Sequence, residues 1–289
     1  MKLIKTKNLK KYGFDIRIED YNYIHSNVKK DWDALINAIN PKDGEVIFDG
    51  AGGYGEVAEK ILKKNKKVEI YLLDETKIQL DRLRSKKLLD NKHIILGDIK
   101  NTKFPNDFFN TCVIKMGIHE VRKNNQQKVF DEIYRILKTN GKFVTWELAL
   151  NENDQKIFQD IIKKKDKLSG FSLMIRNRYF PKHVEMLSYF KKAGFKKVKT
   201  VYIKKYKPKP SLRLHELVSK ERDKILRKKG KITKLDEDGL NIIAKNKANK
   251  LIKYIRKRIP DSLKKKLKFK DLDYDVEFEI EKKIYVGYK

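Results

Sequence analysis

The stretch from Glu45 to Gly55 constrains the fold of this chain more than any other. Residues 46–48 form a short apolar run, which is typical of a buried strand entering a parallel sheet. Asp49 ends the run, and four glycines among the next six residues let the backbone turn sharply and approach a ligand. Apolar residues then share one helical face over 57–62. A strand, a glycine turn and a helix N-terminus predict a nucleotide-type site, because the helix end offers free amides and the positive end of its dipole.

Two cofactors could use such a turn. The dinucleotide fingerprint G-x-G-x-x-G is satisfied by Gly50, Gly52 and Gly55, and an acid, Asp74, follows 19 residues later, which would indicate NAD. The pattern D-x-A-x-G-x-G, typical of S-adenosylmethionine loops, is satisfied by Asp49, Ala51, Gly53 and Gly55. A pyrophosphate would be repelled by Asp49, whereas S-adenosylmethionine has no phosphate and carries an ammonium and a sulfonium. Asp49 therefore favours methyl transfer.

Length and composition bound the class of protein. The 289 residues suggest one large domain or a domain with an appendage, and no apolar run approaches the roughly 18 residues of a membrane span. The charged N-terminus lacks an apolar segment, so no signal peptide is predicted. Cys112 is the single cysteine and the five histidines are scattered, so we expect no intrachain disulfide, no metal site and a cytoplasmic location.

The formal net charge of +31 is the unusual feature of the composition. It is compatible with an anionic partner such as nucleic acid or an acidic membrane surface. Arginine, however, supplies only 12 of the 70 basic residues, and bidentate phosphate and base-edge recognition favours arginine. The charge therefore has two interpretations, an anionic partner or a general bias toward lysine.

Two further acids follow predicted strands. Residues 68–74 read as a second strand that ends in Asp74, which could accept hydrogen bonds from both ribose hydroxyls of a cofactor. Residues 93–96 read as a third strand, and Asp98 after it could bind the adenine amino group. The alternatives are that Asp74 caps the next helix and that Gly97 and Asp98 form only a turn.

A family resemblance rests on motifs along most of the chain. In order they are Asp49 to Gly55, Asp74, Gly97-Asp98, Phe109 to Val113, Ile118-His-Glu-Val121 and Glu132 to Phe143. This order resembles class I S-adenosylmethionine-dependent methyltransferases, and within them the branch of the ubiquinone/menaquinone C-methyltransferases. Thr139-Asn140-Gly141 replaces the usual Pro-Gly-Gly, and Ala51 replaces a glycine. The resemblance covers about 42–205, and 274–289 as a last strand.

The resemblance implies an α/β fold, a Rossmann-like seven-stranded sheet with helices on both faces. It implies S-adenosylmethionine contacts at Asp49, Gly50, Ala51, Gly53, Gly55, Asp74, Asp98, Ile99 and Lys115. Candidates for contact with the methyl acceptor are Tyr21, Tyr23, Trp146, Arg176, Arg178 and Tyr179. For the arginines the alternative is a solvated loop, and for the first two tyrosines it is packing of a leader onto the core.

Methyl transfer is an in-line displacement from a good leaving group, so the protein mainly orients the acceptor and excludes water. A base is needed only if the acceptor must lose a proton. His119, after the predicted fourth strand over 110–116, is the best base candidate, ahead of Glu120 and Glu147. The alternative is a histidine that orients the loop or contacts the cofactor.

The predicted organisation is a catalytic core with an insertion. Residues 1–206 would form the core, with 1–40 as a helical leader; 207–271 would form a lysine-rich helical insertion, and 272–289 the last strand or strands of the sheet. The insertion contains 23 basic and 8 acidic residues, an excess of +15, and two amphipathic helices. Alternating residues predict the last strand over 276–288.

Three functions are compatible with these observations. The first is a methyltransferase acting on a small molecule, and the second is an rRNA or tRNA methyltransferase that holds its substrate with 207–271. The third, a protein that binds the cofactor without catalysis, is disfavoured because the cofactor motifs are intact. The oligomeric state is left open by the sequence.

Overall fold

The computed structural model describes residues 29–289, apart from the side chains of Asn153, Ser172, Leu173, Leu212 and Arg213. This part of the chain forms two compact units. The sheet unit comprises 29–155, 177–206 and 280–289, and the helical unit comprises 156–176 and 207–279. Tyr21, Tyr23 and most of the expected leader lie outside the described residues.

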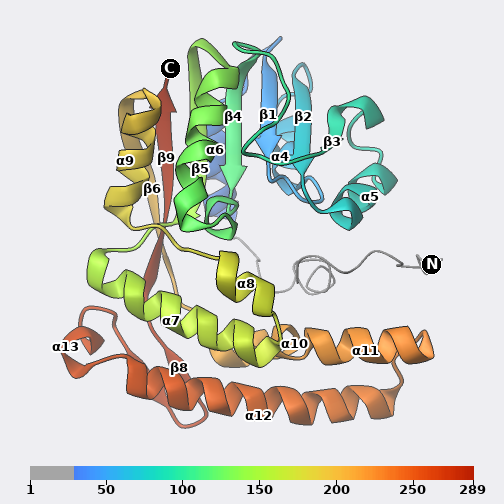
Figure 1. The fold of residues 1–289 in the computed structure, drawn as a ribbon, viewed down its shortest axis with the longest axis vertical. Coiled ribbons are helices and arrows are strands. Elements are labelled where there is room, and N and C mark those ends of the chain that lie inside the picture. The colour runs from blue at the N-terminus through green and yellow to red at the C-terminus, as the bar shows by residue number, and fades with distance from the viewer. Residues whose placement is uncertain (1–28) are drawn as a thin grey trace. The chain divides into compact units, whose positions relative to one another are not determined.

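A seven-stranded sheet forms the centre of the sheet unit (Figure 1). Its strands are β1 (Val46–Gly50), β2 (Glu69–Asp74), β3 (Ile94–Leu96), β4 (Phe109–Lys115), β5 (Leu137–Leu148), β6 (Lys196–Tyr206) and β9 (Ile280–Tyr288). The spatial order is β3-β2-β1-β4-β5-β9-β6. The first five strands in this order pair in parallel, whereas β9 runs antiparallel to both β5 and β6. The predicted α/β fold is confirmed.

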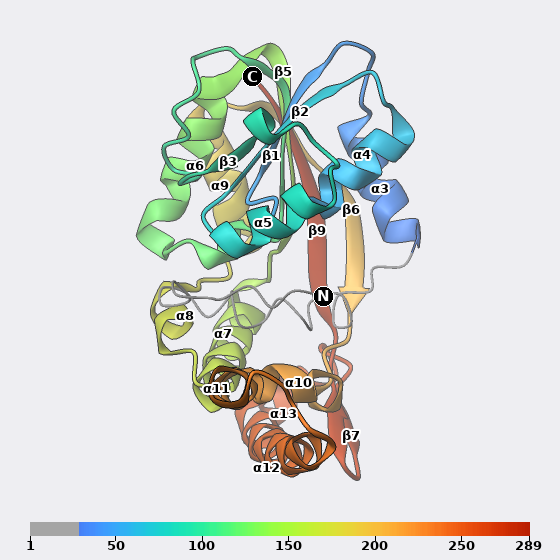
Figure 2. The same cartoon turned by 90° about the vertical axis from the view of Figure 1, so that its right-hand side faces the viewer.

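Helices cover both faces of the sheet, as Figure 2 shows along its edge. One face carries α3 (Lys29–Ile39), α4 (Glu56–Lys64) and α5 (Lys77–Ser85), and the other carries α6 (Lys123–Ile136) and α9 (His183–Ala193). Adjacent strand residues alternate between the two cores: Ile47 packs on the first face and Phe48 on the second. This alternation follows from the two-residue period of a strand.

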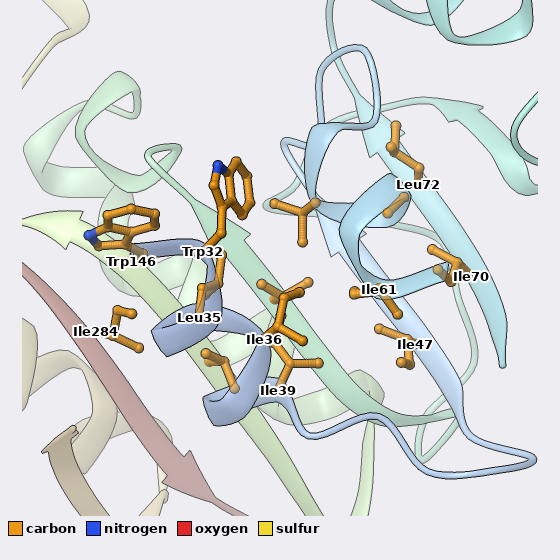
Figure 3. Packing of buried hydrophobic residues seen from close by; sticks show 14 of the residues in the cluster. Trp32, Leu35, Ile36, Ile39, Ile47, Ile61, Ile70, Leu72, Trp146 and Ile284 are labelled. Carbon is orange, nitrogen blue, oxygen red and sulfur yellow. The ribbon is translucent and has the colours of Figure 1, made fainter. Parts of the chain in front are cut away.

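The first core is built mainly of aliphatic side chains, with two tryptophans at one end (Figure 3). Leu35, Ile36 and Ile39 of α3 lie against the sheet, which confirms the helix predicted over 29–40. The second core is aromatic, and Phe130 of α6 packs edge-on against Phe190 of α9. Each fully buried side chain of this size stabilises the unit by about 1.5–3 kcal/mol relative to exposure.

The helix α9 differs from its prediction at one position. The apolar residues of 181–194 predict a helix that turns Val184, Leu187 and Phe190 inward and ends at Gly194. The side chain of Val184 is instead 58% exposed, and Met186 is fully buried. Val184 is two residues from Met186, so a helix that buries the latter turns the former away by about 160°. The helix ends as predicted at Gly194, whose φ of 102° is the left-handed cap that glycine adopts readily.

The helical unit contains most of α7 (Glu152–Ser169), α8 (Ser172–Asn177) up to residue 176, and the segments that follow β6. These segments are η4 (Pro210–Arg213), α10 (Leu214–Leu217), α11 (Ser219–Lys229), α12 (Lys234–Arg258), α13 (Asp261–Lys264) and the hairpin of β7 (Lys270–Leu272) with β8 (Asp275–Glu277). The basic segment is therefore helical, but 156–176 and 272–279 group with it. No described helix is long and apolar enough to cross a membrane.

Two expectations about this part of the chain were wrong. The strand predicted over 276–288 is two strands: β8 pairs with β7, and only β9 joins the large sheet. The alternation of apolar and polar residues continues through 278–279, where the chain passes from the β7–β8 hairpin to the large sheet. The sequence pattern therefore does not reveal that the strand is interrupted there. The second amphipathic helix of the insertion was predicted from an apolar stripe that includes Ile242 and Ile243, but these side chains are 63% and 39% exposed.

Candidate active site

The carboxyl ends of four parallel strands meet at one edge of the sheet (Figure 1). Gly50 of β1 lies opposite Leu73 of β2 and Ile114 of β4, and Asp74 lies opposite Leu96 of β3. Loops that follow these strand ends are consequently neighbours in space. In open α/β sheets this edge is where ligands bind.

The glycine turn after β1 adopts conformations that most side chains avoid. Gly53 and Gly55 have φ angles of 55° and 83°, in the left-handed region. Ala51 shares this region with a φ of 52°, so a position at which glycine is usual is held by alanine. At Gly52 a Cβ atom would lie 2.6 Å from Cγ of Leu72, so the Leu72 side chain would have to shift to admit any side chain there. The predicted sharp turn is confirmed.

Asp49 lies beneath this turn and is fully buried. Its Oδ2 accepts a hydrogen bond from the amide of Ala58 in α4 at 3.2 Å, while Oδ1 has no hydrogen-bond partner among the described residues. Burial raises the pKa of Asp49 to about 7, and the Lys115 ammonium opposes this rise. A buried acceptor atom without a donor is costly. A cationic or N–H-bearing ligand at the turn would remove that cost.

Asp74 connects the end of β2 to the glycine turn. Its Oδ2 accepts from the amide of Gly53 at 2.9 Å, and its Oδ1 accepts from the amide of Thr76 at 2.8 Å. Burial raises the pKa of Asp74, and these amide hydrogen bonds oppose the rise. Each carboxylate oxygen has a further lone pair. Asp74 therefore binds the amide of Thr76, which is itself the N-cap residue of α5, and can still accept hydrogen bonds from a ribose.

Asp98 and Ile99 follow β3. Oδ1 of Asp98 accepts from the amide and from Nζ of Lys100, at 2.9 and 2.7 Å, and the side chain is half exposed. Ile99 packs over the start of the glycine turn: a Cβ atom on Gly50 would lie 2.9 Å from its Cδ1. An apolar side chain beside an acid suits an adenine ring that stacks on Ile99 and hydrogen-bonds with Asp98.

Lys115, the last residue of β4, is held by an acid and two indoles. Its Nζ lies 2.8 Å from Oε2 of Glu56, 4.9 Å from the ring centre of Trp32 and 5.9 Å from that of Trp146. The two tryptophans meet edge to face, with ring centres 6.3 Å apart (Figure 3). Sequence reasoning did not single out Trp32 or Glu56 for the site. The position of Glu56 directly after the glycine turn was an available signal.

Trp146 is 1% exposed, and its Nε1 has no hydrogen-bond partner within the described range. Lys282 of β9 lies 6.0 Å from its ring centre. Trp146 thus places a buried ring and an unused donor beside Lys115, and its expected contact with an acceptor stays a prediction.

His119, in the short helix η3 (Ile118–Glu120), is bonded through both ring nitrogens. Nδ1 lies 2.7 Å from Oε1 of Glu147, and Nε2 lies 3.1 Å from Oε1 of Glu120. The ring stacks on Phe180 with 4.6 Å between ring centres. Burial alone would lower the pKa of His119, but Glu147 and Glu120 outweigh it and raise this pKa to about 9.

This arrangement favours the orienting alternative for His119 over the base. A general base needs a free nitrogen and a neutral ring at working pH, whereas this ring holds its proton and uses both nitrogens. Glu147 has a structural role too, because its carboxylate also accepts from the amides of His119 and Leu148, at 3.2 and 2.8 Å. The described residues thus supply no ready base in place of His119 at this loop.

Arg178 extends the same network. It is 5% exposed, and its Nε and an Nη bind the carboxylate of Glu120 at 3.0 and 2.7 Å. Burial acts to raise the pKa of Glu120, but the Arg178 guanidinium and His119 hold it well below its usual range. Negative and positive groups alternate from Glu147 through His119 and Glu120 to Arg178. Gln126 of α6 secures the loop, donating to the carbonyls of residues 118 and 179 at 2.9 and 2.8 Å.

The side chains of Tyr179 and Arg176, which were also expected to contact the acceptor, do not belong to the network of His119. Tyr179 donates its hydroxyl to Glu185, at 2.9 and 2.8 Å from the two carboxylate oxygens. Arg176 is exposed and belongs to the helical unit, whereas Arg178 belongs to the sheet unit. The arginine pair expected from sequence is therefore not brought together within one unit, and Arg178 is not a solvated loop residue.

Comparisons with known proteins agree with this geometry. Residues 47–141 match the family described as a methyltransferase domain. The ubiquinone/menaquinone biosynthesis C-methyltransferase UbiE of Ruegeria sp. is 25% identical over 183 residues, covering 58% of this chain and 72% of that protein. A candidate methyltransferase from Bacillus halodurans has the same fold, with a TM-score of 0.64 and 18% identity over 90% of this chain and 99% of its own.

A further solved structure is phosphoethanolamine N-methyltransferase 2 of Haemonchus contortus in complex with S-adenosyl-L-methionine. Its TM-score is 0.54 at 18% identity, over 95% of this chain and 57% of its own. The matching methyltransferase domain and the similar methyltransferases support the resemblance of this chain to class I S-adenosylmethionine-dependent methyltransferases, with S-adenosylmethionine as the cofactor.

Proposed function

We propose that this methyltransferase acts on a small molecule. The observation that carries the proposal is that two buried cationic groups at the active edge, Lys115 and Arg178, are each held by a glutamate. Lys115 is bound to Glu56 and Arg178 to Glu120. A polyanionic substrate would have to displace these carboxylates to pair with the two cationic groups, whereas a small acceptor need not.

The residues of the chain divide into binding and orienting roles. The amides of the glycine turn, Asp49 and Asp74 would hold S-adenosylmethionine, which supplies a methyl group on a sulfonium when bound. The orphaned Oδ1 of Asp49 fits such a ligand. The network of His119 fixes the loop after β4, and buried rings around it exclude water. Among the described residues, the loop of His119 offers no ready proton acceptor, which suits an acceptor atom that attacks before it loses a proton.

The alternative is an rRNA or tRNA methyltransferase. It is supported by the net charge of +31 and by the basic residues concentrated in 207–271. In both cases we infer that this segment recruits a partner and takes no part in the chemistry, because the cofactor-binding residues all lie in the sheet unit. A cytoplasmic location stays a prediction from the sequence.

The test is methyl transfer from labelled S-adenosylmethionine into a cell extract that is then separated into RNA, lipid and small-molecule fractions. We expect label in the small-molecule or lipid fraction with the unmodified protein. The matched control is Asp74→Ala, which removes a cofactor contact and should abolish most of the incorporation. Label found only in RNA would contradict the proposal and support the alternative. Equal incorporation with both proteins would show that the label does not arise at this site.

A further inference from the structure

The helix α12 has a buried stripe and an opposite, exposed stripe. Six residues are buried against the helical unit: Leu240, Ala244, Ala248, Leu251, Ile252 and Ile255. Positions three or four apart on the far side form the second stripe, which we call the outer face of α12: Leu235, Gly239, Ile242, Asn246, Lys250, Lys253 and Lys257. At a rise of about 1.5 Å per residue this face is about 33 Å long.

The outer face is apolar in its N-terminal half. Leu235 is 82% exposed and Ile242 is 63% exposed, and Ile243 beside them is 39% exposed. Isolated exposed aliphatic residues are common. Here, however, they share one stripe, and the helix is already held in place by its buried stripe, so these side chains are not needed for its packing.

The C-terminal half of the outer face is cationic. Lys250, Lys253 and Lys257 are exposed, and none has an ion pair within the described part of the chain. The arginines of the same helix turn are engaged elsewhere: Arg256 binds Asp271 at 2.7 Å, and Arg258 binds Asp160. No acidic residue lies on the stripe. The available charge is therefore lysine ammonium groups, which are compact and strongly hydrated.

The hairpin of β7 and β8 adjoins this half of the helix. Nε of Arg256 donates to Oδ1 of Asp271, and Nη2 of Arg256 donates to the carbonyl of Leu272, both at 2.9 Å. At the hairpin tip Tyr274 is 90% exposed. Tyrosine is enriched where one end of a side chain meets lipid and the other meets water.

We propose that the outer face of α12 docks on an anionic membrane surface. Aliphatic side chains enter the boundary between headgroups and acyl chains, and lysines on the same stripe attract acidic headgroups. An RNA would give Leu235 and Ile242 no partner, and RNA sites rely on arginine forks and stacked aromatic rings. A second copy of the chain would set lysines against lysines in a parallel pairing, or against aliphatic side chains in an antiparallel one, because a two-fold interface repeats the same patch. This inference is independent of which acceptor the enzyme methylates.

The test is sedimentation of the full chain with vesicles of phosphatidylcholine alone or mixed with phosphatidylglycerol, at low and at physiological salt. We expect binding to the anionic vesicles that weakens with salt. Each lysine near such a surface contributes about 1 kcal/mol, so the triple substitution Lys250→Gln, Lys253→Gln and Lys257→Gln should weaken binding roughly 100-fold. Arginine at the same three positions should restore it.

Two matched variants complete the test. Lys64→Gln, Lys66→Gln and Lys192→Gln remove the same charge from exposed, unpaired positions of the sheet unit and should leave vesicle binding nearly unchanged. Leu235→Ser with Ile242→Ser should weaken it roughly tenfold, while thermal unfolding shows that the fold is kept. Vesicle binding that survives either outer-face variant overturns the proposal. RNA binding without vesicle binding, or a dimer that the serine variant dissociates, also overturns it by assigning the face to another partner.

Discussion

Replacing His119 by glutamine separates an orienting histidine from a base. In the folded protein Glu147 and Glu120, against the effect of burial, raise the pKa of His119 from 6.5 to about 9. A raised pKa means that the folded state holds the proton more tightly. The stabilisation is therefore complete below about pH 6.5 and is lost as the pH rises through about 9. The difference corresponds to about 3 kcal/mol, at 1.36 kcal/mol for each pH unit.

The assay is urea unfolding of the unmodified protein and of His119→Gln at about pH 6.5 and well above pH 9. Between these two pH values we expect the His119 interaction to account for a loss of about 3 kcal/mol in the free energy of unfolding of the unmodified protein. The variant should not show this loss. His183→Gln is the control, because burial lowers the pKa of His183 and its linkage has the opposite sign. If both proteins respond to pH identically, His119 is not held as an imidazolium. A turnover loss of about 10²–10⁴-fold with unchanged stability would instead support the base.

Three other substitutions test the site. Burial raises the pKa of Asp49 to about 7, so the affinity for S-adenosylmethionine should fall up to tenfold for each pH unit below that value. In calorimetry the affinity of Asp49→Asn should not change with pH, and the same pH dependence as in the unmodified protein would contradict this. Arg178→Met leaves the Glu120 carboxylate buried without its guanidinium and should cost about 3–5 kcal/mol in urea unfolding, partly recovered by Arg178→Lys; no loss would refute the pairing. Gly52→Ala places a Cβ 2.6 Å from Leu72 and should lower the free energy of unfolding by about 1–3 kcal/mol. Gly239→Ala, whose Cβ would have nothing within 4 Å, should not lower it, and equal effects of the two substitutions would show that the contact at Gly52 is not tight.

The fold, and the position of the candidate cofactor residues at one edge of the sheet, could be predicted from sequence because their signals are local. An apolar run ending in Asp49, followed by clustered glycines, specifies a strand, a turn and a helix within about twenty residues. The acids Asp74 and Asp98 each follow a strand, and parallel pairing brings strand ends to one edge without further information.

The acceptor half could not be predicted in the same way, because its contacts join distant segments. Arg178 looks like a loop residue until Glu120, 58 positions earlier, is placed beside it. His119 looks like a base until the buried Glu147 occupies its second nitrogen. The buried face of α12 could not be identified from sequence either. The alanines buried at 244 and 248 are only weakly hydrophobic, whereas the strongly hydrophobic isoleucines at 242 and 243 are exposed.

The measurement that tests the central claim most directly is calorimetric titration of S-adenosylmethionine into the full chain, with NAD as the comparison. We predict a dissociation constant from micromolar to tens of micromolar, about 6–8 kcal/mol, and no binding of NAD. Asp74→Ala should weaken binding by about 1.5–3 kcal/mol, as for a lost hydrogen bond to a charged group. Tight binding of NAD with no binding of S-adenosylmethionine would contradict the account.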